Sequence, residues 1–328
     1  MTIHFDNSGS IVSRVRKKLK AGGLVEIGLI NNVSDAALQA TERQFMRLLK
    51  RGAGDIPFRL RCFSLPQVKR SPEASIRIKN CYTNIGDLYR SNIDGLIVTG
   101  AEPGAPSLRE EPYWRALTEI IDWAKANTLS TIWSCLAAHA AVLHLDGIER
   151  RRLSGKCSGI YDCSKVSDNW LTEDLPSSFK VSHSRLNGLD ESDLRVRGYQ
   201  MLSVSEHAGV DMFAKRQHSQ FIFFQGHPEY EALTLQREYL RDIGRYLAGR
   251  QPMYPVAPSG YFEVPTIAAL DAFRNRAIAE LDPALIANLP RLTLQPSALT
   301  ESAIAAETIF RNWLRYLENA RMDCPLAR

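Results

Sequence analysis

Strand and helix patterns alternate through the first half of the chain, and this alternation limits the possible folds more than any other feature. Short apolar or alternating runs that are typical of strands lie at residues 24–30, 58–65, 93–99 and 131–134. Helical patterns lie between and after them, at residues 36–49, 113–126 and 136–145. Strands that alternate with helices form parallel sheets whose faces the helices cover. The sequence therefore predicts an α/β fold with a mostly parallel sheet flanked by helices.

The second half of the chain has a different pattern. Closely spaced strand patterns lie at residues 180–183, 194–204, 212–215 and 220–224. We expect these strands to form antiparallel additions at one edge of the sheet. The sequence further predicts a helix at 231–247, a proline-rich extended segment at 252–265 and a helix at 308–317. We therefore expect one domain over residues 1–250, with residues 251–328 as a C-terminal helical extension packed on it.

Composition and charge narrow the class of protein. Of the 328 residues, 45% are hydrophobic and 23% charged, which is typical of a globular chain. The net charge of +5 suits an anionic ligand, but the sequence lacks the concentrated basic face of a nucleic-acid binder. The basic cluster at residues 14–20 is interpreted as a solvated helix face. No apolar run approaches ~20 residues and no signal peptide is evident, so we expect a soluble cytoplasmic protein that binds neither membrane nor nucleic acid.

The cysteines argue against a metal centre. No two of the six form a Cys-x-x-Cys pair, so zinc and thioredoxin-like sites are disfavoured and we expect no bound metal. The sequence also contains no glycine-rich phosphate-binding motif. Free thiols are the rule in a cytoplasmic protein, and one of them could be a nucleophile.

Cys135 is the candidate nucleophile because it falls between a predicted strand and a predicted helix. A residue at this junction lies on a sharp turn above the carboxyl edge of a parallel sheet, where ligands bind. The N-terminus of the following helix favours a thiolate there. A buried structural cysteine is the alternative interpretation.

The segment QGHPEY at residues 225–230 places His227 just beyond the end of a predicted strand. Glu229 can reach back to the imidazole, fix its tautomer and stabilise the imidazolium. A loop histidine beside a solvent-facing glutamate is the alternative. A cysteine, a distant histidine and an acid together form an arrangement that attacks acyl carbonyls. Arg185 and Arg241 could each bind a substrate carboxylate through the guanidinium fork, with surface salt bridges as the alternative.

Several segments together resemble the homoserine O-succinyltransferase family, which has the class I glutamine amidotransferase-like fold. The matching segments are IDGLIVTGA at 93–101, YW and LTEI within 113–120, KCSGIYD at 156–162, HSR at 183–185, GHPEY at 226–230, EYLRD at 238–242 and NWL at 312–314. GHPEY combined with EYLRD is specific to this family, whereas GHPE alone also fits glutamine amidotransferases. The resemblance implies a glutamine amidotransferase-like acyltransferase domain over residues 1–250.

The resemblance also implies the roles of Cys135, His227, Glu229 and Arg241, and the residues themselves suggest the others. The expected roles are nucleophile for Cys135, completion of the triad for His227 and Glu229, substrate binding for Arg241, Arg185 and His183, and oxyanion binding for the backbone N–H groups of Leu136 and Ala101. Gly104 falls where the family's acyl choice is set, since glycine there goes with succinyl-CoA and glutamate with acetyl-CoA. The resemblance thus implies transfer of a succinyl group from succinyl-CoA to L-homoserine in methionine biosynthesis, with acyl-CoA as co-substrate, no bound cofactor and a homodimeric assembly.

Three departures from the family pattern surround the expected pocket. The family's HICWGAQA is replaced by a segment ending in WSCLAAHA, the first loop from Asn31 to Glu42 lacks the family's lysine, and Cys163 replaces a histidine. Alternatives therefore stay open: serine or another amino alcohol as acceptor, acetyl-CoA as donor, a glutamine amidase-type hydrolase, or a non-catalytic binding protein with the same fold.

Overall fold

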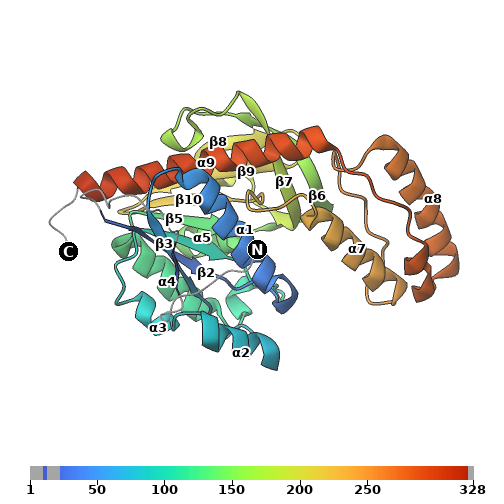
Figure 1. The fold of residues 1–328 in the computed structure, drawn as a ribbon, viewed down its shortest axis with the longest axis horizontal. Helices are drawn as coiled ribbons and strands as arrows, with labels where there is room; N and C mark the ends of the chain where they lie inside the picture. Colours follow the sequence, from blue (N-terminus) through green and yellow to red (C-terminus); the bar gives the residue numbers. More distant parts are fainter. Residues whose placement is uncertain (1–9, 13–22, 324–328) are drawn as a thin grey trace.

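The computed structural model describes residues 10–12 and 23–323, so the basic cluster at 14–20 and Cys324 lie outside the described residues. The described residues form a ten-stranded sheet with helices on both faces, in the strand order β1-β3-β2-β4-β5-β10-β9-β8-β6-β7 (Figure 1). The strands are β1 (Ser10–Val12), β2 (Val25–Ile30), β3 (Phe58–Phe63), β4 (Gly95–Thr99), β5 (Ser130–Ser134), β6 (Arg151–Lys165), β7 (Ser178–Gly188), β8 (Gln200–Ser205), β9 (Gly209–Arg216) and β10 (Gln220–Phe224).

The helices flank this sheet. They are α1 (Asp35–Ala53), α2 (Pro72–Cys81), α3 (Ile85–Leu88), α4 (Trp114–Asn127), α5 (Leu136–Asp146), α6 (Glu191–Val196), α7 (Thr234–Leu247), α8 (Val264–Glu280) and α9 (Pro296–Asp323), with short 3-10 turns η1 (Leu108–Glu110), η2 (Trp170–Thr172) and η3 (Pro283–Asn288). None of these described helices combines the length and hydrophobicity that a membrane span requires.

The centre of the sheet is parallel, as predicted, and its register aligns three strand ends. Strands β3, β2, β4, β5 and β10 run in one direction. Thr99, Ser134 and Phe224, the last residues of β4, β5 and β10, are register partners. The residues that follow them, Gly100, Cys135 and Gln225, therefore leave the sheet at the same carboxyl edge.

Antiparallel strands extend the sheet on both sides. Beside β10, the strands β9, β8, β6 and β7 pair antiparallel in turn, which confirms the predicted additions. At the other edge β1 also pairs antiparallel, with β3. The strand predicted over 194–204 was wrong in its first part: Leu194 is buried in the short helix α6 and β8 begins at Gln200. Gly198, in the left-handed region with φ +77°, turns the chain between them.

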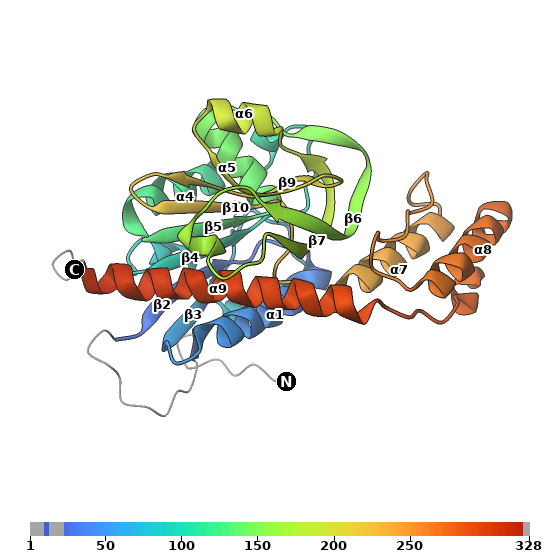
Figure 2. The same ribbon diagram turned by 90° about the horizontal axis from the view of Figure 1, so that it is seen from above.

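Two hydrophobic layers cover the faces of the sheet. One contains buried side chains of α1 and α9, and the other those of α4 and α5. Helix α9 has 28 residues, longer than the helix predicted at 308–317, and lies along the sheet in both views (Figures 1 and 2). Its Trp313 is fully buried and donates a hydrogen bond from Nε1 to Ser130 Oγ at 3.0 Å. This contact ties the C-terminal helix to the central strand β5.

A third hydrophobic cluster joins α7, α8 and η3, and these helices project beyond the sheet (Figure 2). Helix α8 begins at Val264, just where the predicted extended segment ends. The domain boundary between residues 250 and 251 stays a prediction. Helix α7 precedes this boundary and α8 follows it, and both helices belong to one hydrophobic cluster. The position of α7 matters for the site because it carries Arg241.

Candidate active site

Cys135 lies on a sharp turn between β5 and α5. Its φ of 52° and ψ of −111° place a non-glycine residue in a sparsely populated backbone region, which costs on the order of 1–3 kcal/mol. Its backbone N–H donates a hydrogen bond to Phe224 O at 2.7 Å, so β10 holds the turn in place. The helix that follows is packed through small buried residues, Ala137, Ala138, Ala140 and Ala141. The half-buried sulfur thus lies at the carboxyl edge of the sheet, at the N-terminus of a helix.

Gly100 brings the loop after β4 against the first turn of α5. A Cβ on Gly100 would overlap the Cβ of Leu136 and lie 3.1 Å from Ala137 N. The loop backbone at Gly100, one residue before Ala101, therefore packs directly on the first turn of α5, beside Cys135. Ala101 and Leu136 are the two residues whose N–H groups were expected to bind the oxyanion.

We expect Gly100→Ala to lower kcat by about 10-fold or more, because the added methyl group must displace either the loop or the first turn of α5 from the oxyanion site. Gly155→Ala is the matched control, since a Cβ there has no atom within 4 Å. Steady-state kinetics measures the kcat of both variants, and thermal melting shows whether a lower kcat comes from loss of stability. Equal activity of both variants would contradict the placement of the oxyanion site at this contact.

The first loop braces the end of β4. Asn32 donates its backbone N–H to Thr99 Oγ1 at 2.9 Å, and its Oδ1 accepts from Leu65 N at 3.0 Å. Arg70, nearly buried, donates to Asn31 O at 3.2 Å and to Asp35 Oδ1 at 3.1 Å. This loop lacks the family's lysine, and the structure places the guanidinium of Arg70 inside it. The loop therefore fixes the strand end from which Gly100 and Ala101 follow.

The structure brings His227 together with both expected partners. His227 Nδ1 lies 2.8 Å from Glu229 Oε1, and because a carboxylate accepts, Nδ1 carries the hydrogen and Nε2 stays available to the thiol. The Cys135 side chain lies close enough to the imidazole to influence its pKa. The ring is stacked on Tyr230, with ring centroids 4.2 Å apart. The His227 backbone N–H donates to Ser182 O at 2.7 Å, which fixes the loop to β7.

The charges around His227 favour its protonated form. Burial alone would lower the pKa of the imidazole, but the Glu229 carboxylate and the Cys135 side chain outweigh burial. The pKa of His227 therefore lies well above its usual value. This direction fits an imidazolium that stabilises a neighbouring thiolate.

His183 and Arg185 lie behind the His227 loop, where their polar atoms face protein. Both are buried; Arg185 donates to the backbone oxygens of Asn187, at 2.8 Å, and Ala208. His183 Nε2 lies 3.3 Å from Asp211 Oδ1, directly under Gly226. The geometry thus favours structural roles for these two residues, and their expected role in substrate binding gains no support from it.

Cys163, His183 and Asp211 could hold a metal ion by their spacing, since their ligand atoms all lie within 4.8 Å of one another. The hydrogen bonding argues against this. Arg185 Nε donates to His183 Nδ1 at 3.5 Å, and His183 Nε2 lies 3.3 Å from Asp211 Oδ1, so both ring nitrogens already face groups of the protein. Burial also raises the pKa of the Cys163 thiol, which keeps it protonated. We interpret the cluster as a buried polar network.

His139, where the family has a glutamine, is also internal. It is buried in α5 and its Nε2 lies 2.9 Å from Gln225 Oε1. Burial lowers the pKa of His139 to about 4, so the ring is neutral near pH 7. Gln225 immediately precedes Gly226 and His227, so the contact with His139 helps to fix the start of the His227 loop.

A polar cluster lies beside Tyr230, and the sequence assigned no role to three of its members. Glu238 accepts from Tyr230 OH at 2.6 Å and from Ser184 Oγ. Lys156 Nζ lies 3.6 Å from Glu238 Oε2 and 2.8 Å from Asp242 Oδ2. The missed residues, Lys156, Ser184 and Glu238, each lie within a segment that matched the family pattern.

Arg241 is the predicted substrate residue that belongs to this cluster. Its guanidinium contacts Asp242 Oδ1 at 3.0 Å and its side chain is 46% exposed. The loop with Gly104 faces the same helix, because Glu102 lies 3.9 Å from Arg245 of α7. Gly104 itself is exposed, with open space where a Cβ would be. Arg241 thus has donors available for a ligand, in contrast to Arg185.

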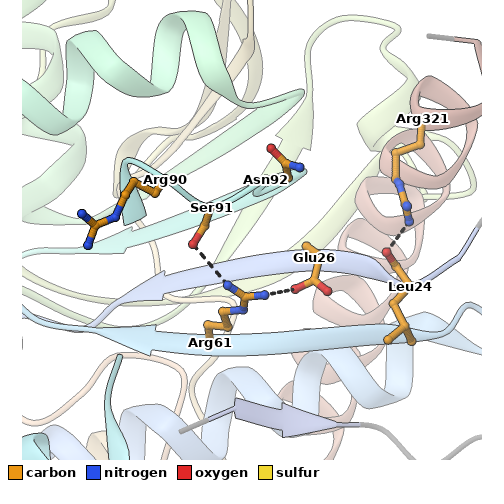
Figure 3. Close-up of a pocket in the computed structure, with 7 residues that line it drawn as sticks. All are labelled: Leu24, Glu26, Arg61, Arg90, Ser91, Asn92 and Arg321. Atoms are coloured by element: carbon orange, nitrogen blue, oxygen red, sulfur yellow. Dashed lines mark hydrogen bonds and ion pairs between the residues drawn. The ribbon is translucent and has the colours of Figure 1, made fainter. Parts of the chain in front are cut away.

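A hollow of about 450 Å³ is lined by Leu24, just before β2, and by Ser91 and Asn92, which precede β4 (Figure 3). Figure 3 shows Arg61 between Ser91 Oγ, at 3.1 Å, and Glu26 Oε2, at 3.4 Å. Arg321 donates to Leu24 O on the far side of the hollow. The charged side chains of Glu26, Arg61 and Arg321, which line the hollow, are therefore paired with other groups of the protein.

Two solved structures resemble the fold at low sequence identity. A glutamine amidotransferase from Thermotoga maritima aligns with a TM-score of 0.49 and 16% identity, covering 89% of this chain and 98% of that one. A glutamine amido transferase from Methylobacillus flagellatus aligns with a TM-score of 0.48 and 17% identity, covering 89% and 94%. Both TM-scores are below 0.5, so they add nothing about activity.

Sequence comparison gives a far stronger match. A family model described as homoserine O-succinyltransferase matches residues 7–322. A homoserine O-succinyltransferase from Rhodopseudomonas palustris is 53% identical over 326 residues, which cover 96% of this chain and 98% of the relative. One from Bradyrhizobium japonicum is 55% identical over 292 residues, covering 89% of each. The resemblance in the sequence motifs is confirmed, and the chain belongs to the homoserine O-succinyltransferase family.

Proposed function

We propose that the protein transfers a succinyl group from succinyl-CoA to the side-chain hydroxyl of L-homoserine, through an acyl-enzyme on Cys135. The observation that carries the proposal is the Cys135, His227 and Glu229 array at the carboxyl edge of the sheet. Membership of the family supports the choice of substrates and a place in methionine biosynthesis.

In the first half-reaction the Cys135 thiolate attacks the thioester carbonyl. The oxyanion receives hydrogen bonds from the N–H groups of Leu136 and Ala101, each of which contributes about 3 kcal/mol to lowering the barrier. The tetrahedral intermediate then expels CoA as a thiolate, and the His227 imidazolium protonates it. Succinyl-Cys135 and a neutral His227 remain.

Acylation also prepares His227 for the second half-reaction. The sulfur loses its negative charge, which had helped to raise the pKa of His227. The neutral imidazole, oriented by Glu229, takes the proton of the homoserine hydroxyl while its oxygen attacks the acyl carbon. The Cys135 thiolate leaves, and the thiolate and imidazolium pair is restored.

We place the homoserine backbone on the polar cluster beside Tyr230. Arg241 would hold the substrate carboxylate, because its guanidinium is partly exposed. We therefore expect Arg241→Ala to raise the KM for homoserine by about 10-fold or more, with little change in the rate of acyl-enzyme formation. Arg237→Ala, an exposed arginine on the same helix, is the control. Equal KM values for the two variants would remove Arg241 from the acceptor site.

The decisive experiment is mass spectrometry of the intact protein after brief exposure to succinyl-CoA, followed by L-homoserine. We expect a succinyl adduct that homoserine discharges as O-succinylhomoserine. Acetyl-CoA and serine are tested in parallel as donor and acceptor, and glutamine is tested for ammonia release. Faster discharge by serine, or ammonia without an adduct, would overturn the assignment in favour of another acceptor or a hydrolase.

Some finer expectations stay predictions. The preference for succinyl-CoA rests on Gly104, which leaves space beside the loop for the longer acyl chain. A homodimer, a cytoplasmic location and the lack of a resident cofactor likewise stay predictions.

A further inference from the structure

Glu111 holds the loop that carries Gly104. It lies between η1 and α4, and its side chain is buried, with the residue only 6% exposed. Its Oε1 accepts hydrogen bonds from two consecutive backbone N–H groups, those of Gly104 and Ala105, both at 2.7 Å. Two successive N–H groups that converge on one anionic oxygen form a strong, geometrically defined contact.

The backbone of Glu111 is held in place by its neighbours. Glu111 donates its backbone N–H to Leu108 O at 3.3 Å, and its carbonyl accepts from Trp114 N at 2.9 Å. The side chains of Leu108 and Tyr113, on either side, are buried in the core. The carboxylate therefore projects from a fixed part of the scaffold.

The loop itself has few other restraints. Residues 102–104 are exposed, and nothing lies within 4 Å of the Cβ position of Gly104. Glu102 and Arg245 form a long ion pair, at 3.9 Å, between two exposed side chains, which contributes little. The loop is thus held at its start, where Gly100 packs on Leu136, and at Gly104 and Ala105, where Glu111 binds.

We propose that Glu111 is a positioning residue that sets the shape of residues 101–104 and thereby the choice of acyl donor. The inference rests on the proposed function, in which Ala101 binds the oxyanion and Gly104 faces the acyl chain. Glycine at position 104 leaves room for a succinyl group only while the loop backbone at this position is kept out of the space that the acyl chain occupies. The Glu111 carboxylate supplies this restraint.

The test is the ratio of kcat/KM for succinyl-CoA to that for acetyl-CoA in three variants. Glu111→Ala should lower this ratio about 10-fold, with the KM for homoserine within about twofold of wild type, because only the donor loop is released. Glu111→Gln keeps an acceptor oxygen and should recover most of the ratio. Glu110→Ala, the exposed neighbour in η1, should match wild type.

A loss of activity that is equal for both donors, or an unchanged ratio in Glu111→Ala, would overturn the proposal. If the alanine variant fails to fold, Glu111→Asp takes its place, because the shorter side chain withdraws the acceptor oxygen from the N–H groups of Gly104 and Ala105. A lowered ratio in Glu111→Asp supports the restraint, and an unchanged ratio contradicts it. Failure of the proposed function is distinguishable, because wild-type protein would then form no succinyl adduct. An adduct in wild type with an unchanged ratio in the variants would refute only the role of Glu111.

Discussion

Replacement of Cys135 by alanine should abolish both the succinyl adduct and turnover, with a loss in kcat of about 10⁴-fold or more. The acyl-enzyme requires a sulfur at this position, and alanine provides no nucleophile. The fold should survive, because alanine can occupy the same turn and the backbone hydrogen bond to Phe224 does not involve the side chain. Release of CoA and the mass of the intact protein measure the two losses independently, and thermal melting checks the fold.

Cys157 supplies the matched control. It is also half-buried, it lies on β6 next to Lys156, and burial raises the pKa of its thiol. We expect Cys157→Ala to keep the adduct and most of the turnover. A succinyl adduct that persists in Cys135→Ala but disappears in Cys157→Ala would move the nucleophile to β6 and end the present mechanism.

Most of the parallel core could be predicted from the sequence because β2, β4 and β10 contain short apolar runs and β3 alternates between apolar and polar residues. Strands β4, β5 and β10 are buried along their whole length, and β4 (GLIVT) and β10 (QFIFF) are largely apolar, whereas β5 has the sequence STIWS. Strand β6 could not be predicted in the same way. Its residues are mixed in character and mostly exposed or half-buried, and it is held by long-range pairing with β7 across a register shift between Arg152 and Cys157.

The proximity of Cys135 and His227 could be predicted for a related reason. Parallel strands place their carboxyl ends at one edge, so Cys135 after β5 and His227 just beyond β10 had to lie close together. Neighbouring residues in a strand point to opposite faces, and which face is the inner one depends on the whole sheet. In β7 the alternation puts His183 and Arg185 inside, whereas Ser184 meets Glu238. The sequence motif identified the segment but could not identify the face.

The second large effect is expected at His227, where substitution by glutamine should lower kcat by about 10³-fold or more. The same change should slow the alkylation of Cys135 by iodoacetamide at pH 6.5. The sign follows from the raised pKa of His227: the imidazole is protonated at this pH and stabilises the thiolate beside it. Without the imidazolium, the sulfur loses the positive charge that stabilises its reactive form, so alkylation slows. A pH series of alkylation rates, read by mass spectrometry, measures the change.

Glu229→Gln tests the same charge interaction by removing the carboxylate and keeping the imidazole. The carboxylate is the largest of the influences that raise the pKa of His227, so its loss should lower that pKa and move the fast alkylation to higher pH. The loss in kcat should be smaller than for His227→Gln, because the imidazole stays present. His218→Gln, at an exposed position, should leave both measurements unchanged. Wild-type alkylation rates in His227→Gln would mean that the imidazole does not stabilise the thiolate, and His227 would then act only as the base toward homoserine.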